Sequence, residues 1–265
     1  MDYIHLSQVF RNLALQAGDA IMKIYSKGNV AIETKSDSSP VTNADKAADT
    51  IIYQGLKQAF PDVAVVTEEK LESHYLKANN FILVDPLDGT KEFINRTGEF
   101  TVNIAYIQNG TPTHGVVYAP AIKRLFSNDQ NGKSNETIKL SAKAGQTINK
   151  PLRVAAPDAN ALTVVASKSH INFETKEYIA KYSISNCKNA GSSLKFCLIA
   201  NGEADFYPRL GRTMEWDTAA GHAILSGAGG YVTNLLTKEP LCLSLIHISE
   251  PTRLLSIAYA GVFLK

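Results

Sequence analysis

The stretch Asp85-Pro86-Leu87-Asp88-Gly89-Thr90 directly follows the apolar run 81–84. A buried strand that ends in this way places two carboxylates, three residues apart, at the edge of a sheet. Because proline fixes its own φ and glycine permits a sharp turn, both carboxylates and the Leu87 carbonyl can converge on one point. Oxygen ligands beside the outward-facing Gly89 and Thr90 amides suit a hard cation that holds a phosphate. Taken alone, the stretch could equally be an ordinary turn.

Acidic residues also accompany two other predicted elements. The short apolar strand 63–67 ends in Glu68 and Glu69, and Asp217 stands just ahead of a helical run over 219–228. Each feature alone has an ordinary explanation, a solvated loop for the glutamates and a helix cap for the aspartate. Together with the first two aspartates, these acids would repel one another unless cations neutralised them. No His or Cys has comparable spacing, so the set predicts magnesium rather than zinc.

The acidic motifs follow one another in the order found in a known family. Over about residues 1–241, the chain resembles the lithium-sensitive, magnesium-dependent phosphatases typified by inositol monophosphatase. The matching motifs are Val41 to Asp45, Glu68-Glu69, Asp85 to Thr90 and Trp216 to Gly221. Within that family, Asp88 to Phe93 and Gly191 to Cys197 are similar to the CysQ-type 3′(2′),5′-bisphosphate nucleotidases.

The resemblance implies a layered α+β or α/β fold, the α-β-α-β-α sandwich of the inositol monophosphatases. It implies a phosphatase domain over 1–241, built from two tightly joined halves at about 1–126 and 151–241. The segment 127–150 is rich in Asn, Ser, Lys and Gly, and is predicted to be a surface excursion between the halves.

The same resemblance assigns roles to the acidic residues. Two or more magnesium ions would be held by Glu68, Asp85, Asp88, Asp217 and the Leu87 carbonyl. Asp45 and Thr90 would orient and deprotonate the attacking water, with Glu69 as a catalytic residue just outside the ligand set. A carboxylate is a weak base at neutral pH, so Asp45 can act only on a water that a metal has acidified. Thr90 could also cap a short helix over 91–94.

Substrate contacts are implied in the same way. Lys195 and Arg209 would bind the 5′-phosphate, since arginine suits bidentate phosphate recognition. Ser192 is expected to donate a hydroxyl, and His170 is a candidate for contact with adenosine. On a helix, a lysine such as Lys195 is more often simply solvated. The remaining expected substrate contacts are Gly89, Thr90 and Asp217.

The implied reaction is the magnesium-dependent removal of the 3′-phosphate of adenosine 3′,5′-bisphosphate, which yields AMP and phosphate in sulfate assimilation. The compound 3′-phosphoadenylyl sulfate is a second implied substrate. Two alternatives stay open. One is an inositol monophosphatase or a fructose-1,6-bisphosphatase, and the other is an inert metal-dependent protein that binds phosphonucleotides.

Composition agrees with a small-molecule partner. The 265 residues are 45% hydrophobic, and 27 Lys and Arg face 25 Asp and Glu, so no nucleic-acid partner is predicted. No apolar run reaches the roughly 18 residues that a transmembrane segment needs. Three cysteines without Cys-x-x-Cys spacing favour reduced thiols in a cytoplasmic protein. Peripheral attachment to the cytoplasmic face of the inner membrane, and a monomer or a homodimer, remain open.

Local patterns predict most of the individual elements. Helices are expected from Ile4 to near Gly28, with an amphipathic pattern, and over 45–60, 173–182, 194–200 and 217–228. Strands are expected over 101–107 and 115–118, on either side of the hairpin signal Asn109-Gly110, and over 162–166 and 204–207.

The C-terminal tail, residues 242–265, departs from the family pattern. After Leu241 the expected closing strand is absent, and residues 243–254 resemble translated sequencing adaptor. The tail is therefore interpreted as anomalous, with an artefactual origin left open. Residues 242–254 are expected to be exposed or poorly packed, whereas 255–259 could form a makeshift strand at the edge of a sheet.

Overall fold

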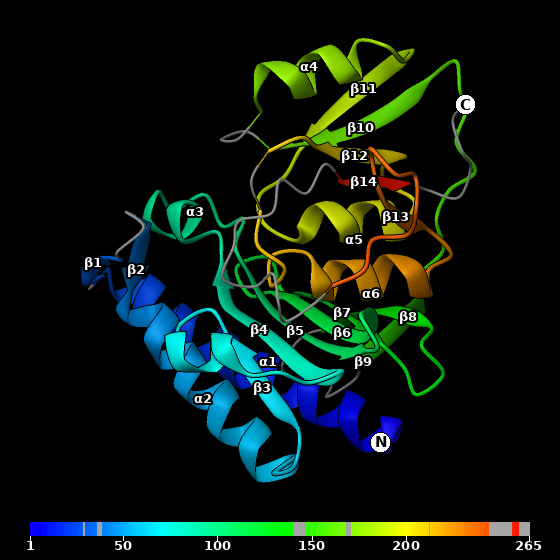
Figure 1. Cartoon of the computed structure of the whole chain (residues 1–265). Helices are drawn as coiled ribbons and strands as arrows, with labels where there is room; N and C mark the ends of the chain where they lie inside the picture. The colour runs from blue at the N-terminus through cyan, green and yellow to red at the C-terminus, as the bar shows by residue number, and fades with distance from the viewer. Residues whose placement is uncertain are drawn as a thin grey trace.

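Two β-sheets, with helices between them and outside them, form the fold in a computed structural model of the protein (Figure 1). None of the helices in the described part of the chain is both long enough and apolar enough to cross a membrane. The structure describes residues 1–28, 30–35, 39–139, 147–167, 171–211, 213–243 and 256–259. For residues 256–259, only the backbone is described.

The larger sheet has seven strands in the order β3-β4-β5-β6-β7-β8-β9. Strands β3 and β4 are parallel, and every later pair is antiparallel. The predicted hairpin between β5 and β6 is confirmed, because Asn109 and Gly110 have φ values of 49° and 79°, as a two-residue hairpin loop requires. The strands are β3 (Ala64–Thr67), β4 (Asn80–Asp88), β5 (Thr101–Gln108), β6 (Thr111–Ala119), β7 (Arg124–Asn128), β8 (Ser134–Lys139) and β9 (Thr147–Pro151).

The prediction of a surface excursion over 127–150 is wrong, because β8 and β9 extend the sheet there. Its polar residues misled the interpretation, since several of them are buried and paired across strands. Glu136 accepts a hydrogen bond from Arg124 Nε over 2.5 Å, and Ser134 Oγ accepts one from Asn128 Nδ2 over 3.0 Å. Residues 140–146 of this segment lie outside the described part.

Helices α1 (Tyr3–Lys27) and α2 (Asn43–Ala59) pack together on one face of the larger sheet (Figure 1). Both confirm the predicted helices. The Asp2 side chain caps the start of α1, and Gly28 ends it with a φ of 71°, a left-handed conformation that glycine adopts without strain. A preceding hairpin, β1 (Ile32–Thr34) and β2 (Pro40–Thr42), leads into α2.

Helices α5 (Leu194–Ala200) and α6 (Ala219–Gly227) cover the other face of the larger sheet and confirm two further predicted helices. They contact each other closely, because a Cβ on Gly221 would lie 2.5 Å from the Phe196 ring. Above them lies a five-stranded sheet in the order β11-β10-β12-β14-β13. Its strands are β10 (Leu162–Ala166), β11 (Ile184–Asn189), β12 (Phe206–Arg209), β13 (Tyr231–Asn234) and β14 (Ser256–Tyr259).

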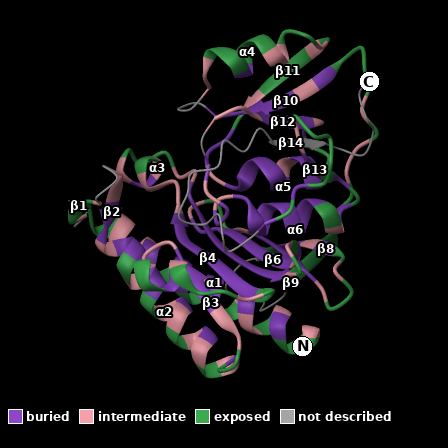
Figure 2. Cartoon of the chain, in the orientation of Figure 1, coloured by how far each residue is buried: buried purple, intermediate pink, exposed green. Residues whose placement is uncertain are grey.

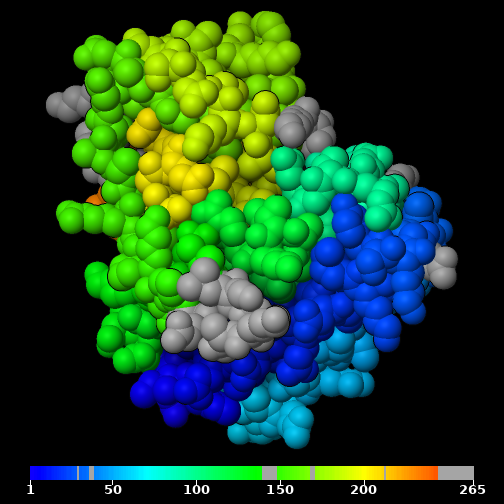
Figure 3. All heavy atoms as spheres, turned by 180° about the vertical axis from the view of Figure 1, so that it is seen from behind, coloured from blue at the N-terminus to red at the C-terminus, as the bar shows by residue number. Residues whose placement is uncertain are grey.

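Helix α4 (Phe173–Ile179) covers the outer face of the smaller sheet, where it contacts β12. From the helix pair α1 and α2 to α4, the layers are therefore helix, sheet, helix, sheet, helix, and the predicted α-β-α-β-α architecture is confirmed (Figure 1). From behind, the blue and cyan N-terminal segments lie at one end and the yellow-green segments of the smaller sheet at the other (Figure 3). Two short elements remain, η1 (Leu71–Tyr75) and α3 (Thr90–Ile94).

The makeshift strand predicted in the tail is present as β14, but its predicted edge position is wrong. β14 pairs antiparallel with both β12 and β13, so it lies inside the sheet and joins these two strands. Strand propensity predicted the element, whereas its two neighbours depend on the long-range fold. Leu243 also contradicts the expected exposure, because its side chain is 2% exposed and its N–H donates to the Gly110 carbonyl over 2.7 Å. Residues 244–255 lie outside the described part.

Apolar side chains fill both spaces beside the larger sheet, and its central strands are buried on both faces (Figure 2). One cluster lies beneath α1 and α2, and the other lies between this sheet and the smaller one. Fully buried strands of this kind form a rigid support. The C-terminal end of β4 and the loop before α6 therefore have fixed positions.

Candidate active site

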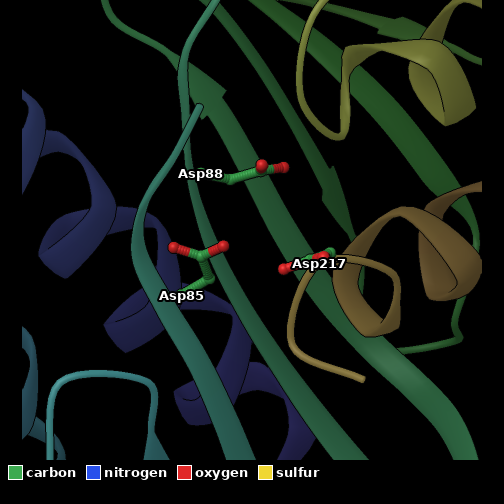
Figure 4. Close-up of side chains that lie close together, drawn as sticks. All are labelled: Asp85, Asp88 and Asp217. Carbon is green, nitrogen blue, oxygen red and sulfur yellow. The ribbon is translucent and has the colours of Figure 1, made fainter. Parts of the chain in front are cut away.

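Three aspartates converge between the end of β4 and the loop before α6 (Figure 4). Asp85 and Asp88 belong to β4, and Asp217 belongs to the loop. Each contributes a carboxylate oxygen, and these oxygens all lie within 4.8 Å of one another. Asp85 is almost completely buried, with 1% of its surface exposed. The structure thus brings together acids more than 120 residues apart in the sequence.

The turn that ends β4 needs its glycine. The pairing of β4 with β5 shifts between Asp85 and Asp88, and the Leu87 N–H donates to Asp85 Oδ1 over 3.1 Å. Gly89 has a φ of 90°, and a Cβ there would lie 2.3 Å from Ser192 Oγ. A larger residue would meet both backbone strain and a steric clash. The local sequence therefore determines how the two aspartates are presented.

Burial and the repulsion of neighbouring carboxylates raise the pKa values of Asp85 and Asp88. The pKa of Asp88 is raised to about 6, mainly by burial and then by the charge of Asp217. The pKa of Asp85 lies well above its ordinary value, mainly because of burial and then because of the charges of Glu68 and Asp88. Two carboxylates that resist ionisation, with a third close by, are suited to a bound divalent cation, because the cation would neutralise the repulsion. Oxygen-only donors favour magnesium over softer metals.

Lys35 bridges the two glutamates that follow β3. Its Nζ lies 2.7 Å from Glu68 Oε1 and 2.7 Å from Glu69 Oε1. Glu68 lines the same pocket as Asp88 and Asp217, and its pKa is raised to about 7, first by burial, although Lys35 opposes the shift. The predicted ligand Glu68 therefore lies beside the three aspartates, with its carboxylate paired to a lysine.

A hydrogen bond joins Thr90 directly to Asp45, the two residues expected to orient and deprotonate the attacking water. Thr90 Oγ1 donates to Asp45 Oδ1 over 3.1 Å, while Asp45 Oδ2 accepts from the Thr42 N–H and hydroxyl over 2.8 and 2.6 Å. Asp45 is 2% exposed, so this carboxylate is held rigidly. The expectation that Thr90 caps the short helix is wrong, because Gly89 occupies the cap position of α3 and Thr90 is its first residue.

Asp217 is held by the turn before α6 rather than by the helix itself. Its Oδ2 accepts hydrogen bonds from Thr213 Oγ1 over 2.8 Å and from the Met214 N–H over 3.1 Å. Thr218 occupies the cap position of α6. The explanation of Asp217 as a helix cap is therefore wrong, because these bonds close a turn that aims the carboxylate at the other acids.

A pocket of about 270 Å³ opens beside the acids, and three predicted substrate contacts line it: Ser192, Lys195 and Arg209. Lys195 is 5% exposed and donates to the Ser192 carbonyl over 2.6 Å, so it is not a solvated helix lysine. Ser192 has a φ of 52° and donates to the Asp88 carbonyl over 2.8 Å. Although burial disfavours the charge of Arg209, Tyr207 and Asp217 hold its pKa above the ordinary value.

Gly89, Thr90 and Asp217 also line this pocket, whereas His170 lies outside the described residues. Sequence reasoning missed Lys35, Asn103 and Ser193, which all bond to the acids or to their backbone. Asn103 carried a signal as an amide within the otherwise apolar run 102–107, and Ser193 lies within the motif Gly191 to Cys197. Lys35 stands in a polar loop, and nothing local distinguishes it.

Comparison with known proteins agrees with this geometry. The sequence model of the inositol monophosphatase family matches residues 2–256. The 3′(2′),5′-bisphosphate nucleotidase CysQ of Escherichia coli K12 is 46% identical over 226 residues, which cover 83% of this chain and 87% of that protein. The crystal structure of CysQ from Bacteroides thetaiotaomicron superposes with a TM-score of 0.80 at 34% identity and covers 98% of both chains.

An inositol monophosphatase from Anabaena shares the fold alone, with a TM-score of 0.72 at 22% identity over 97% of this chain and 90% of that one. The chain belongs to the inositol monophosphatase family. It is a phosphatase.

Proposed function

We propose that this protein removes the 3′-phosphate of adenosine 3′,5′-bisphosphate in a magnesium-dependent reaction that yields AMP and phosphate. The convergence of Asp85, Asp88 and Asp217 beside a pocket that contains Arg209 and Lys195 carries this proposal. One part of the site suits a metal and a phosphate ester, and the other suits a second anionic group. The similarity to proteins named 3′(2′),5′-bisphosphate nucleotidase supports the choice of substrate.

Metal binding falls to the acids of the pocket. The donor set fits magnesium, since it consists of clustered carboxylate oxygens and no described sulfur or imidazole ligand joins it. Bound magnesium neutralises phosphate charge and acidifies the attacking water. We assign the ligands to Glu68, Asp85, Asp88, Asp217 and the Leu87 carbonyl, and we propose that they hold two or more ions.

The proton of the attacking water leaves through Thr90 and Asp45. The Thr90 hydroxyl donates to Asp45 Oδ1, so the Thr90 oxygen can accept a hydrogen bond from the attacking water. This hydrogen bond would orient a lone pair of the water oxygen toward phosphorus. Asp45 receives the proton in this arrangement. Glu69, whose Oε1 contacts Lys35, contributes to the local field rather than to bond breaking.

Recognition of the second phosphate falls to the two cations that line the pocket. Arg209 offers a planar guanidinium for bidentate contact, and Lys195 adds a buried positive charge near the Ser192 backbone. The amides of Gly89 and Thr90 complete the donors. The Ser192 hydroxyl donates its one proton to the Asp88 and Glu99 carbonyls in this structure, so the expected donation from Ser192 to substrate requires that proton to turn away from them. Contact between His170 and the adenosine, and hydrolysis of 3′-phosphoadenylyl sulfate, are parts of the same proposal.

Phosphate release from a substrate panel tests this function. Adenosine 3′,5′-bisphosphate, inositol 1-phosphate and fructose 1,6-bisphosphate are compared at equal concentration, with and without magnesium. We expect the nucleotide to give the highest kcat/KM and activity to vanish with EDTA. A higher value for the inositol or sugar phosphate would favour the alternative family activities. Binding of the nucleotide without turnover would favour an inert binding protein.

We also propose a biological setting for this reaction. Clearing adenosine 3′,5′-bisphosphate would serve sulfate assimilation, and this role fits a cytoplasmic protein with the three free cysteines that the structure shows. Peripheral membrane attachment, and a monomer or homodimer, belong to the same proposal. We propose residues 1–241 as the phosphatase domain, in two joined halves, and 242–265 as a tail of anomalous sequence, of which Leu243 and β14 nevertheless pack and pair with this domain.

A further inference from the structure

Two residues without an assigned role connect the acids of β4 to the loop before α6. Asn103, on β5, donates from Nδ2 to Asp88 Oδ2 over 3.3 Å and to Ser193 Oγ over 2.9 Å. The Ser193 hydroxyl in turn donates to the Asp217 carbonyl over 2.7 Å. Both side chains are 1% exposed. A continuous buried hydrogen-bond bridge thus runs from one predicted metal ligand to the other.

The chemistry of the bridge allows one orientation of the amide. Facing a carboxylate, the asparagine must present its donor group, because its carbonyl oxygen would repel the Asp88 oxygens. Both Nδ2 protons are then used, while Asn103 Oδ1 is buried without a partner. An unpaired buried acceptor costs free energy. The two hydrogen bonds that Nδ2 donates, to Asp88 and to Ser193, offset this cost.

Ser193 is also diverted from its usual local role. It occupies the cap position of α5, where a serine oxygen normally accepts a bond from the helix backbone, yet it makes no such bond. Its hydroxyl instead accepts from Asn103 and donates to the backbone of Asp217. The larger sheet and the loop before α6 are thereby tied together at the acids.

We propose that Asn103 and Ser193 are positioning residues that hold Asp88 and Asp217 at the separation a divalent cation requires. This inference rests on the proposed metal-dependent function. Neither residue needs to touch substrate. Hydrogen bonds behind metal ligands orient them, and their loss commonly weakens metal affinity by about 10- to 100-fold.

Direct magnesium titration of the metal-free protein tests the bridge, with heat of binding as the readout and without substrate. We expect Asn103→Ala and Ser193→Ala each to raise the Kd for magnesium by about 10- to 100-fold. The Kd of the double variant for magnesium should be no higher than the higher of the two single-variant Kd values, because either change breaks the same bridge. Ser193→Ala removes one oxygen only, so it keeps the test available if Asn103→Ala fails to fold.

Asn128→Ala is the matched control. Asn128 is also a buried asparagine, 2% exposed, but its Nδ2 donates to the Gly132 and Ala223 carbonyls and to Ser134 Oγ. It should lower the thermal midpoint and leave the magnesium Kd within about twofold, since it orients no acid. Unchanged Kd values in Asn103→Ala and Ser193→Ala would overturn the positioning role. A wild-type protein that binds no magnesium would instead overturn the proposed function itself.

Discussion

Thr90 Oγ1 donates a hydrogen bond to Asp45 Oδ1 over 3.1 Å, although 45 residues separate them. The contact joins the start of α3, directly after the acidic turn, to the capping box of α2. Asp45 therefore serves two structures at once, because its other oxygen caps α2 through Thr42. The base that we propose for the attacking water is rigid for this reason.

Removing the Thr90 hydroxyl should separate proton transfer from binding. Thr90→Val keeps the shape of the side chain and is expected to lower kcat by about a hundredfold or more, the usual contribution of a positioned proton acceptor. Thr90→Ser retains the hydroxyl and should stay near the wild type. Steady-state kinetics at saturating magnesium measure both, and equal losses in the two variants would show that the hydroxyl is not responsible.

Replacing one proposed ligand should abolish metal-dependent turnover while the fold survives. Asp88→Asn removes a charge from the acidic cluster and is expected to lower kcat/KM by at least about a hundredfold, because the metal supplies several kcal/mol of transition-state stabilisation. Asp205→Asn is the control, since Asp205 binds the Thr163 N–H in the smaller sheet. Near-normal activity of Asp88→Asn with unchanged magnesium dependence would remove Asp88 from the ligand set.

Arg209 should matter only for substrates with a second phosphate. Arg209→Ala is expected to raise the KM for adenosine 3′,5′-bisphosphate by about ten- to a hundredfold, the equivalent of about 1.5–3 kcal/mol for a charge-assisted contact. Adenosine 3′-monophosphate should be almost unaffected. Arg153→Ala, at an exposed position away from the pocket, controls for loss of positive charge. Equal effects on both substrates would assign Arg209 a structural role.

Metal removal should make stability fall as the pH rises. Glu68, with a pKa of about 7, and Asp85, with a pKa well above its ordinary value, hold protons more tightly in the folded protein than in the unfolded chain. The free energy of unfolding therefore falls as the pH rises toward and through these values. Burial lowers the pKa of His222 to about 4, which opposes the trend only below about pH 6.5, the ordinary value of histidine.

Thermal unfolding between pH 6.5 and 8 measures this effect. In EDTA the midpoint should fall across this window, whereas saturating magnesium should flatten the dependence, because the ion replaces the protons. A midpoint that is constant or rises in EDTA would contradict the raised pKa values of the acidic cluster.

Most individual elements and the acidic motifs were predictable because their signals are local, whereas the layered architecture was implied by the family resemblance. The run 81–84 and the turn after it identify a buried strand that ends in acid, and Asn109-Gly110 identifies the hairpin between β5 and β6. The roles of Lys35 and Asn103 were not predictable, since each depends on partners brought close only by the fold. The polar strands β8 and β9 were missed because the buried polar groups of β8 are satisfied by neighbouring strands, while the residues of β9 whose burial is described are exposed.

The identity of the nucleotide product tests the central claim most directly. Adenosine 3′,5′-bisphosphate is incubated with the full chain, with magnesium or with EDTA, and the nucleotides are separated and identified by phosphorus NMR. We predict that 5′-AMP and inorganic phosphate form in equal amounts, only with magnesium. Release of adenosine 3′-phosphate, or turnover that persists in EDTA, would contradict the proposed function.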